Sequence, residues 1–231
     1  IVDVLVRHEV LRTTFPDVDG APHQLIAAPE TVTDELDWQV VDSAAEIESS
    51  LLTGFDLTRH WPVRFRLLRD GESYVFAAVA HHIAADGESM PPLLTDIVTA
   101  YAARAEGRTP EFAPLPVQFA DYAIWQHDVL GSPDDPESVV GQQLAYWAER
   151  LAGLPDVLEL PTDRPRPPIA SQRGAAVTLT LPEELTAGID QLGIDADVTP
   201  FMVFHAALAT LLSRLSGADD IAVGTSVAGR G

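Results

Sequence analysis

Apolar and polar residues along this chain form blocks that predict strands and helices in alternation. Residues 73–80 are almost entirely apolar, with β-branched and aromatic side chains, and predict a buried strand. Residues 63–68 alternate apolar and basic side chains, which predicts a strand with one face in water. The Asp70-Gly71 turn lies between the two runs, so we expect them to pair.

Other segments extend the alternation to the end of the chain. Helical spacing predicts a helix through Val10 and further helices over residues 43–52, 91–104, 118–130, 138–151, 182–192 and 200–215, with Ser89 and Thr199 as caps. Strands are expected at residues 38–41, 176–181 and 221–227, and a hairpin at residues 13–26. Tyr122 and Trp125 are expected to be core aromatics. The alternation indicates a layered α/β fold.

A proline-stiffened stretch at residues 161–168 is the clearest boundary. We therefore expect a first lobe over residues 1–160, a connector over residues 161–168 and a second lobe beginning at residues 169–231.

Composition narrows the class of protein. The 231 residues are 46% hydrophobic and can bury a sizeable core. The net charge of -21 would repel a phosphate backbone, which argues against nucleic-acid binding. Without cysteine there is neither a disulfide nor a thiolate nucleophile. No apolar run approaches the ~18 residues of a spanning helix, and we expect a cytoplasmic protein without membrane partners.

The candidate chemistry lies in the segment from His81 to Gly87, directly after the predicted strand at residues 73–80. Two adjacent imidazoles followed by Asp86 place acid-base groups where a strand enters a loop. Neighbouring strand residues point in opposite directions, so one ring faces a cleft while the other packs inward. The same geometry chelates one metal ion poorly, and no metal site is expected.

This segment resembles the HHxxxDG signature of nonribosomal peptide synthetase condensation domains, which belong to the chloramphenicol-acetyltransferase-like superfamily. Residues 7–15, RHEVLRTTF, resemble the family motif RHExLRTxF, and residues 121–125, DYAIW, resemble YxDYAxW. Residues 219–230 are similar to the strand and GR turn that precede the family's next motif. The family's usual Trp after HHxxxDG is Glu88 here, which leaves acceptor-side packing open.

The resemblance implies a two-lobe fold and amide-bond formation. An acceptor amine attacks a donor thioester, both carried on phosphopantetheine arms of carrier domains, with a neighbouring adenylation domain as a further partner. His82 is expected to orient the amine and accept its proton, and the Gly87 amide to donate towards the oxyanion. Asp86 is expected to pair with Arg230 from the second lobe. His81 is expected to pack inward.

Arg7 and Arg12 match the second motif and are expected to form ion pairs of the scaffold. The resemblance also implies motifs outside the chain at both ends, so we expect about half of a domain, inactive when isolated and prone to associate. Three alternatives stay open: an O-acyltransferase that uses coenzyme A or a carrier domain, an epimerisation domain, and a catalytically silent platform for carrier and adenylation domains.

Overall fold

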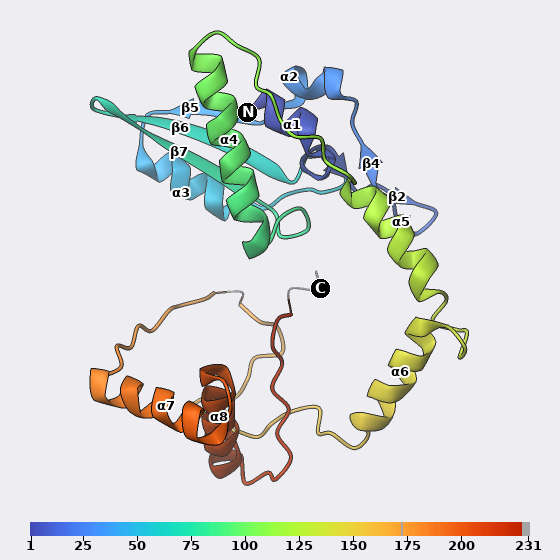
Figure 1. The fold of residues 1–231 in the computed structure, drawn as a ribbon, viewed down its shortest axis with the longest axis vertical. Coiled ribbons are helices and arrows are strands. Elements are labelled where there is room, and N and C mark those ends of the chain that lie inside the picture. The colour runs from blue at the N-terminus through green and yellow to red at the C-terminus, as the bar shows by residue number, and fades with distance from the viewer. Residues whose placement is uncertain (172, 228–231) are drawn as a thin grey trace. The chain divides into compact units, whose positions relative to one another are not determined.

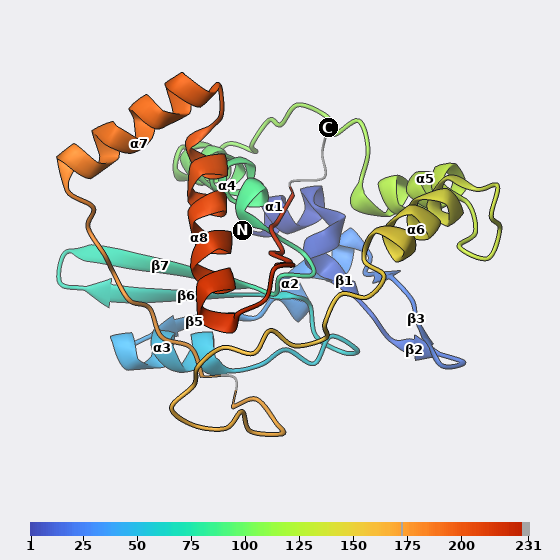
Figure 2. The same cartoon turned by 90° about the horizontal axis from the view of Figure 1, so that it is seen from below.

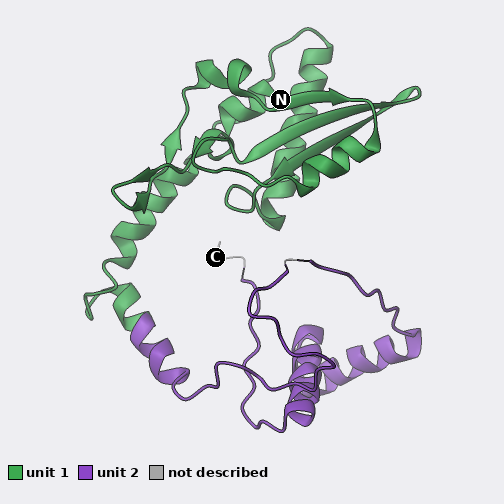
Figure 3. Cartoon of the chain, turned by 180° about the vertical axis from the view of Figure 1, so that it is seen from behind, with its two compact units in different colours: residues 1–143 green, residues 144–231 purple. Residues whose placement is uncertain are grey.

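The computed structural model describes residues 1–171 and 173–227, and Arg230 therefore lies outside the described part. The chain packs as two compact units, residues 1–143 and 144–231 (Figure 3). The division falls inside a helix, whereas the proline-rich stretch at residues 161–168 lies within the second unit and forms neither helix nor strand. The three lobe boundaries given above stay a prediction.

The first unit is built around a three-stranded sheet. Strands β5 (Trp38–Val41) and β6 (Val63–Asp70) are parallel, and β7 (Ser73–Ala80) runs antiparallel to β6. The β6–β7 turn is two residues long and has Gly71 at φ +63°, a left-handed conformation that suits glycine. The predicted hairpin between these strands is confirmed.

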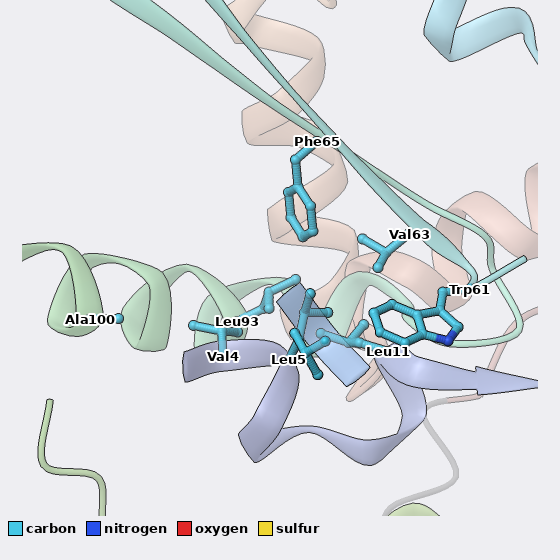
Figure 4. Packing of buried hydrophobic residues seen from close by; sticks show 9 residues of the cluster. Val4, Leu5, Leu11, Trp61, Val63, Phe65, Leu93 and Ala100 are labelled. Carbon is cyan, nitrogen blue, oxygen red and sulfur yellow. The ribbon is translucent and has the colours of Figure 1, made fainter. Parts of the chain in front are cut away.

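Helices cover both faces of this sheet. Helix α3 (Ala44–Leu52) packs against one face, and α4 (Met90–Ala105) lies on the opposite side together with α1 (Val2–Arg7) (Figures 1 and 2). Because successive strand residues face opposite sides, Val63 and Phe65 enter the core under α1 and α4. Figure 4 shows this core, which contains Val4, Leu5, Leu11, Val32, Trp61, Val63, Phe65, Leu93 and Ala100.

The residues on the other face of β6 contradict the prediction that this face lies in water. Arg64 and Arg66 were expected on a wet face, but each is only 6% exposed. Helix α3 covers them: Arg64 donates to the carbonyl oxygens of Ser50, Thr53 and Gly54, and Arg66 Nε donates to Ser50 Oγ at 2.9 Å. The Arg64 guanidinium thus satisfies otherwise orphan carbonyl oxygens at the C-terminal end of α3, and Arg66 bonds the Ser50 hydroxyl of the same helix.

The N-terminal segment also departs from expectation. Helix α1 ends at Arg7 instead of continuing through Val10, because His8 is extended and a 3₁₀ turn, Glu9–Arg12, follows. The predicted hairpin is present as two short ladders, with Asp19 and Gly20 at positive φ in its turn. These ladders comprise β1 (Thr13–Thr14), β2 (Asp17–Val18), β3 (Ala21–Pro22) and β4 (Leu25–Ile26), and the 3₁₀ turn Pro29–Thr31 and α2 (Val32–Glu35) follow.

Helices α5 (Phe119–Leu130) and α6 (Val139–Arg150) follow α4. The prediction that Trp125 is a core aromatic is wrong, since it is 57% exposed, and Tyr122 is only partly buried. Helix α5 is fixed to the rest of the unit at its N-terminal end, where the Gln118 side chain donates to Arg7 O at 2.8 Å. Trp125 lies beyond that contact and packs against Tyr122, with ring centroids 5.7 Å apart.

The second unit contains α7 (Glu183–Ala196) and α8 (Pro200–Ser216). Thr199 caps α8 as predicted, because its side chain accepts from the Met202 N–H at 3.3 Å. The strands expected at residues 176–181 and 221–227 are not formed. Strand structure requires a hydrogen-bonded partner, and Val177 in the first segment is 96% exposed.

Over the described residues, no single helix has the length and apolarity needed to cross a membrane. The α7 and α8 helices meet that criterion only when taken together, with a bend of 103° between them.

Candidate active site

The segment from His81 to Ser89 joins β7 to α4. Strand β7 ends at Ala80, residues 82–84 form a turn, and a 3₁₀ helix (Gly87–Ser89) leads into α4. The His81 N–H donates to Pro62 O at 2.8 Å, and the Ala84 N–H donates to His81 O at 3.0 Å. The sheet therefore holds the start of this loop through backbone hydrogen bonds.

The His81 ring is partly buried and directed into the protein. Its Nδ1 accepts from the Ile83 N–H at 3.0 Å, and its ring meets Phe55 edge-on, with centroids 6.0 Å apart. A backbone N–H can only donate, so Nδ1 carries the lone pair and the neutral ring has its proton on Nε2. The His81 side chain thus bridges the histidine turn through its hydrogen bond with the Ile83 N–H.

His82, in contrast, is exposed, and its ring forms no hydrogen bond with any described residue. It sits on the turn itself and not on the strand. The exposed imidazole of His82 is therefore accessible to a ligand. A general acid or base needs such access, because it must come within hydrogen-bond reach of the proton that it transfers.

Asp86 fixes the second half of the loop. Its Oδ1 accepts from the Ser89 N–H at 2.9 Å and from Ser89 Oγ at 2.6 Å, while Ser89 Oγ accepts from the Asp86 N–H at 3.1 Å. Together these bonds form a capping box. Asp86 is the N-cap of the 3₁₀ helix, and Ser89 is its partner three residues later. Ser89 also occupies the N-cap position of α4, as predicted, but its side chain makes no capping hydrogen bond to that helix.

Gly87 begins the 3₁₀ helix, where an N–H has no acceptor within the helix. Its φ is outside the left-handed region, and no described atom lies within 4 Å of where a Cβ would stand. The described fold would therefore accept alanine at this position.

Both arginines of the second motif have partners within the first unit. Arg7 Nε donates to Asp96 Oδ2 at 2.8 Å, and its guanidinium lies 4.9 Å from the Phe112 ring centroid. Arg12 is buried and donates to the Leu5 and Ala27 carbonyl oxygens, with Glu9 Oε1 at 3.4 Å.

Asp96 was not singled out from the sequence. On α4, its Oδ2 lies 2.8 Å from Arg7 Nε and 2.6 Å from His8 Nε2, so one carboxylate joins α4 to the end of α1. The signal that could have revealed it is a lone acid three positions after the buried Leu93, and therefore on the inward-facing stripe of the predicted helix.

Within the described residues, no group of three or more His, Asp or Glu side chains is placed to hold a metal ion.

Comparison with known proteins identifies the family. The Condensation domain family model matches residues 1–231. The chain is 46% identical to the isonitrile lipopeptide synthase of Mycobacterium tuberculosis and 43% identical to the dimodular nonribosomal peptide synthase of Bacillus subtilis. Each match covers 100% of this chain but only 9% and 10% of those proteins, respectively.

Solved structures agree with this assignment. The X-domain from teicoplanin biosynthesis, solved in complex with OxyB, is 38% identical, with a TM-score of 0.81 over 93% of this chain and 48% of that chain. The four-domain nonribosomal peptide synthetase AB3403 shares the fold, with a TM-score of 0.74 at 24% identity over 93% of this chain and 16% of that chain. The α/β chloramphenicol-acetyltransferase-like fold is thus confirmed, and the chain belongs to the condensation-domain family of nonribosomal peptide synthetases.

Proposed function

We propose that this chain contributes the histidine loop of an acyltransferase that joins two carrier-bound substrates through an amide bond. The observation that carries the proposal is an exposed His82 on a turn whose neighbours, His81 and Asp86, are both fixed by hydrogen bonds. The family's chemistry implies aminoacyl or peptidyl thioesters as substrates, presented on phosphopantetheine arms by carrier domains. Carrier domains and a neighbouring adenylation domain are the proposed partners.

In the proposed reaction, the nitrogen of the acceptor amine attacks the carbonyl carbon of the donor thioester. The N–C bond forms, the C–S bond breaks, and the proton lost by the amine passes to the neutral imidazole of His82. The thiolate that leaves receives a proton, which regenerates the free ring. A positioned acid-base group of this kind contributes about 10²- to 10⁴-fold in rate.

Gly87 and Asp86 have separate proposed roles. Gly87 leaves room for the thioester to approach the backbone, and its amide is proposed to donate towards the developing oxyanion. Asp86 shapes the loop through its capping box and is proposed to form an ion pair with Arg230. A structure that describes Arg230 tests this pair directly: separation beyond one bridging water would reject it.

The central experiment uses the full-length protein that contains this chain, with donor and acceptor carrier proteins loaded with aminoacyl thioesters. His82→Ala should lower the rate of dipeptidyl thioester formation, measured by mass spectrometry, by about 10²-fold or more. His127→Ala replaces another exposed histidine, on α5, and is the matched control that should keep the wild-type rate. Product formation at the wild-type rate by His82→Ala would reject the role.

Gly87→Ala provides an independent test. Because a Cβ meets no described atom there, the variant should fold with unchanged thermal stability and lose activity only if substrate needs that space. Full activity would show that no reacting group approaches Gly87.

A binding platform is the second candidate, and one observation favours it. The similar X-domain was solved as a complex with OxyB, so a related fold binds another protein. A full-length wild-type protein that binds loaded carrier proteins but forms no product would favour the platform over the enzyme.

A further inference from the structure

The histidine turn has a second line of support that begins at a buried arginine on the sheet. Arg64 lies on β6 opposite Val79 of β7, two residues before His81. Its guanidinium is directed away from the core under α1 and α4 and towards the end of α3. Its contacts therefore connect α3 with the strands that carry the histidine loop.

Arg64 fixes the segment that follows α3. Nη1 donates to Ser50 O at 3.2 Å and to Thr53 O at 3.0 Å, and Nη2 donates to Gly54 O at 2.9 Å. Three carbonyl oxygens on one planar fork leave this segment little freedom. Asp37 Oδ2 lies 3.9 Å from Arg64 Nε and provides a compensating charge.

Phe55 is the next residue of that segment, and it lies between Arg64 and His81. The Arg64 guanidinium carbon is 4.0 Å from the centroid of the Phe55 ring, a cation–π contact. The Phe55 ring meets the His81 ring at an interplanar angle of 88°, with centroids 6.0 Å apart. Edge-to-face packing of this kind is a preferred arrangement of two rings and favours this orientation of the His81 ring.

The orientation of His81 matters because its Nδ1 accepts the Ile83 N–H across the turn that exposes His82. Rotation of the His81 ring would break that bond and leave the turn held only by its backbone hydrogen bonds among those of the described residues. We propose that Arg64 and Phe55 are positioning residues of the active site, which act through His81 to hold the turn that carries His82. This inference rests on the role proposed above for His82.

The expected effect falls on turnover more than on substrate binding. Neither Arg64 nor Phe55 is proposed to touch the substrate, so loss of the Phe55 ring should lower kcat and leave KM for the loaded carrier proteins unchanged. Small misplacement of a catalytic group is sufficient for a loss of about 10- to 100-fold.

The test compares Phe55→Leu with Phe55→Tyr in the full-length protein. Leucine removes the ring but leaves the Arg64 hydrogen bonds to backbone carbonyls, whereas tyrosine keeps the ring and should restore kcat to near the wild-type value. Leu52→Ala is the matched control, since Leu52 lies at the end of α3 and is 88% exposed. Should Phe55→Leu fail to fold, Phe55→Met keeps the apolar volume without a ring.

Hydrogen exchange followed by mass spectrometry supplies a readout independent of activity. In Phe55→Leu, the peptide that contains the Ile83 amide should exchange about tenfold faster, while peptides from β6 and β7 keep wild-type protection. Faster exchange throughout the first unit would mean a merely structural role and would overturn the proposal. Unchanged exchange at Ile83 would overturn it as well.

Different results would contradict the proposed reaction and the proposed positioning role of Phe55. If the wild-type protein forms no product, the proposed reaction is wrong, and the exchange experiment still decides whether Phe55 holds the turn. If His82→Ala is inactive but Phe55→Leu retains the wild-type kcat, the reaction stands and the positioning role is wrong.

Discussion

The ion pair between Asp96 and Arg7 allows a quantitative test of how the first arginine of the RHEVLRTTF segment contributes to the fold. Arg7, His8 and Asp96 have side chains that are 16%, 21% and 15% exposed, and one oxygen of Asp96 lies within 2.8 Å of a nitrogen of each partner. The change to make is Asp96→Ala, which leaves the Arg7 charge at the α1–α4 contact without its acid.

The burial of the pair determines the expected magnitude. Exposed ion pairs contribute about 0.2–1 kcal/mol, and breaking a buried pair costs about 3–5 kcal/mol. Arg7 keeps its bond to Ala113 O at 2.6 Å and its contact with Phe112, so it is not stranded completely. We therefore expect Asp96→Ala to lower the free energy of unfolding of the first unit by about 1.5–3 kcal/mol.

A double-mutant cycle with Arg7→Met separates the pair from other effects of the two substitutions. Urea denaturation near neutral pH, followed by circular dichroism, should give a coupling energy of about 1–2 kcal/mol. Since the pair is shielded from solvent, 1 M NaCl should leave most of the coupling in place. A coupling energy below about 0.3 kcal/mol, the usual error of additivity, would refute the assigned role.

Four further predictions concern stability, acid sensitivity and association. Phe65→Ala should lower the free energy of unfolding by about 3–5 kcal/mol in urea denaturation, whereas the exposed Leu52→Ala should stay within about 0.5 kcal/mol of wild type. Asp86→Ala should cost at least about 0.5–2 kcal/mol in the same assay through loss of the capping box, and no change would show that the cap is dispensable. The hydrogen bond from Arg104 lowers the pKa of Asp3 in the folded protein, so the ion pair stabilises the fold above the pKa of an unfolded Asp and this stabilisation is lost as the pH falls below about 4. Asp3→Asn should therefore reduce the fall in melting temperature over that acid range. An unchanged pH dependence of the melting temperature would contradict the pairing. Expressed alone, residues 1–231 should associate in size-exclusion chromatography and lack condensation activity, because apolar side chains such as that of Val177 are exposed; a monomer with turnover would contradict this.

The parts of the fold that the sequence predicts correctly are those with local signals. The β6–β7 hairpin follows from two apolar runs around Asp70-Gly71, and α8 follows from Thr199 before an apolar helical stripe. In both cases the residues that determine the structure lie within a few positions of each other. Neither the hairpin nor the helix depends on a residue far away in the sequence.

The errors share a different cause. Arg64 and Arg66 have the spacing of a solvent-exposed strand face, and only the position of α3 shows that its backbone carbonyl oxygens, for Arg64, and its Ser50 hydroxyl, for Arg66, take the place of water. Trp125 is of a residue type common in protein cores, yet it is 57% exposed and lies beyond the contact that the Gln118 side chain makes with Arg7 O before the first turn of α5. Burial depends on which element covers a face, and periodicity alone carries no information about that.

The histidine loop depends both on local sequence signals and on contacts with distant elements. The motif identifies the residue types, but the roles of its members come from contacts outside the motif. Pro62 O holds the His81 backbone, Phe55 limits the His81 ring, and Ser89 completes the box with Asp86. None of these contacts involves the His82 side chain.

Because the His82 side chain takes no part in these contacts, substitutions in the loop can separate chemistry from folding. A side chain that contributes nothing to the hydrogen bonds of its own turn can be removed with little change in folding, so a loss of turnover in His82→Ala reports on chemistry. Substitution of His81 removes an acceptor for the Ile83 N–H and a partner of Phe55 and should change stability and turnover together. The two adjacent imidazoles are therefore distinguishable by experiment: lost turnover with an unchanged melting temperature in His81→Ala would show that the roles are reversed.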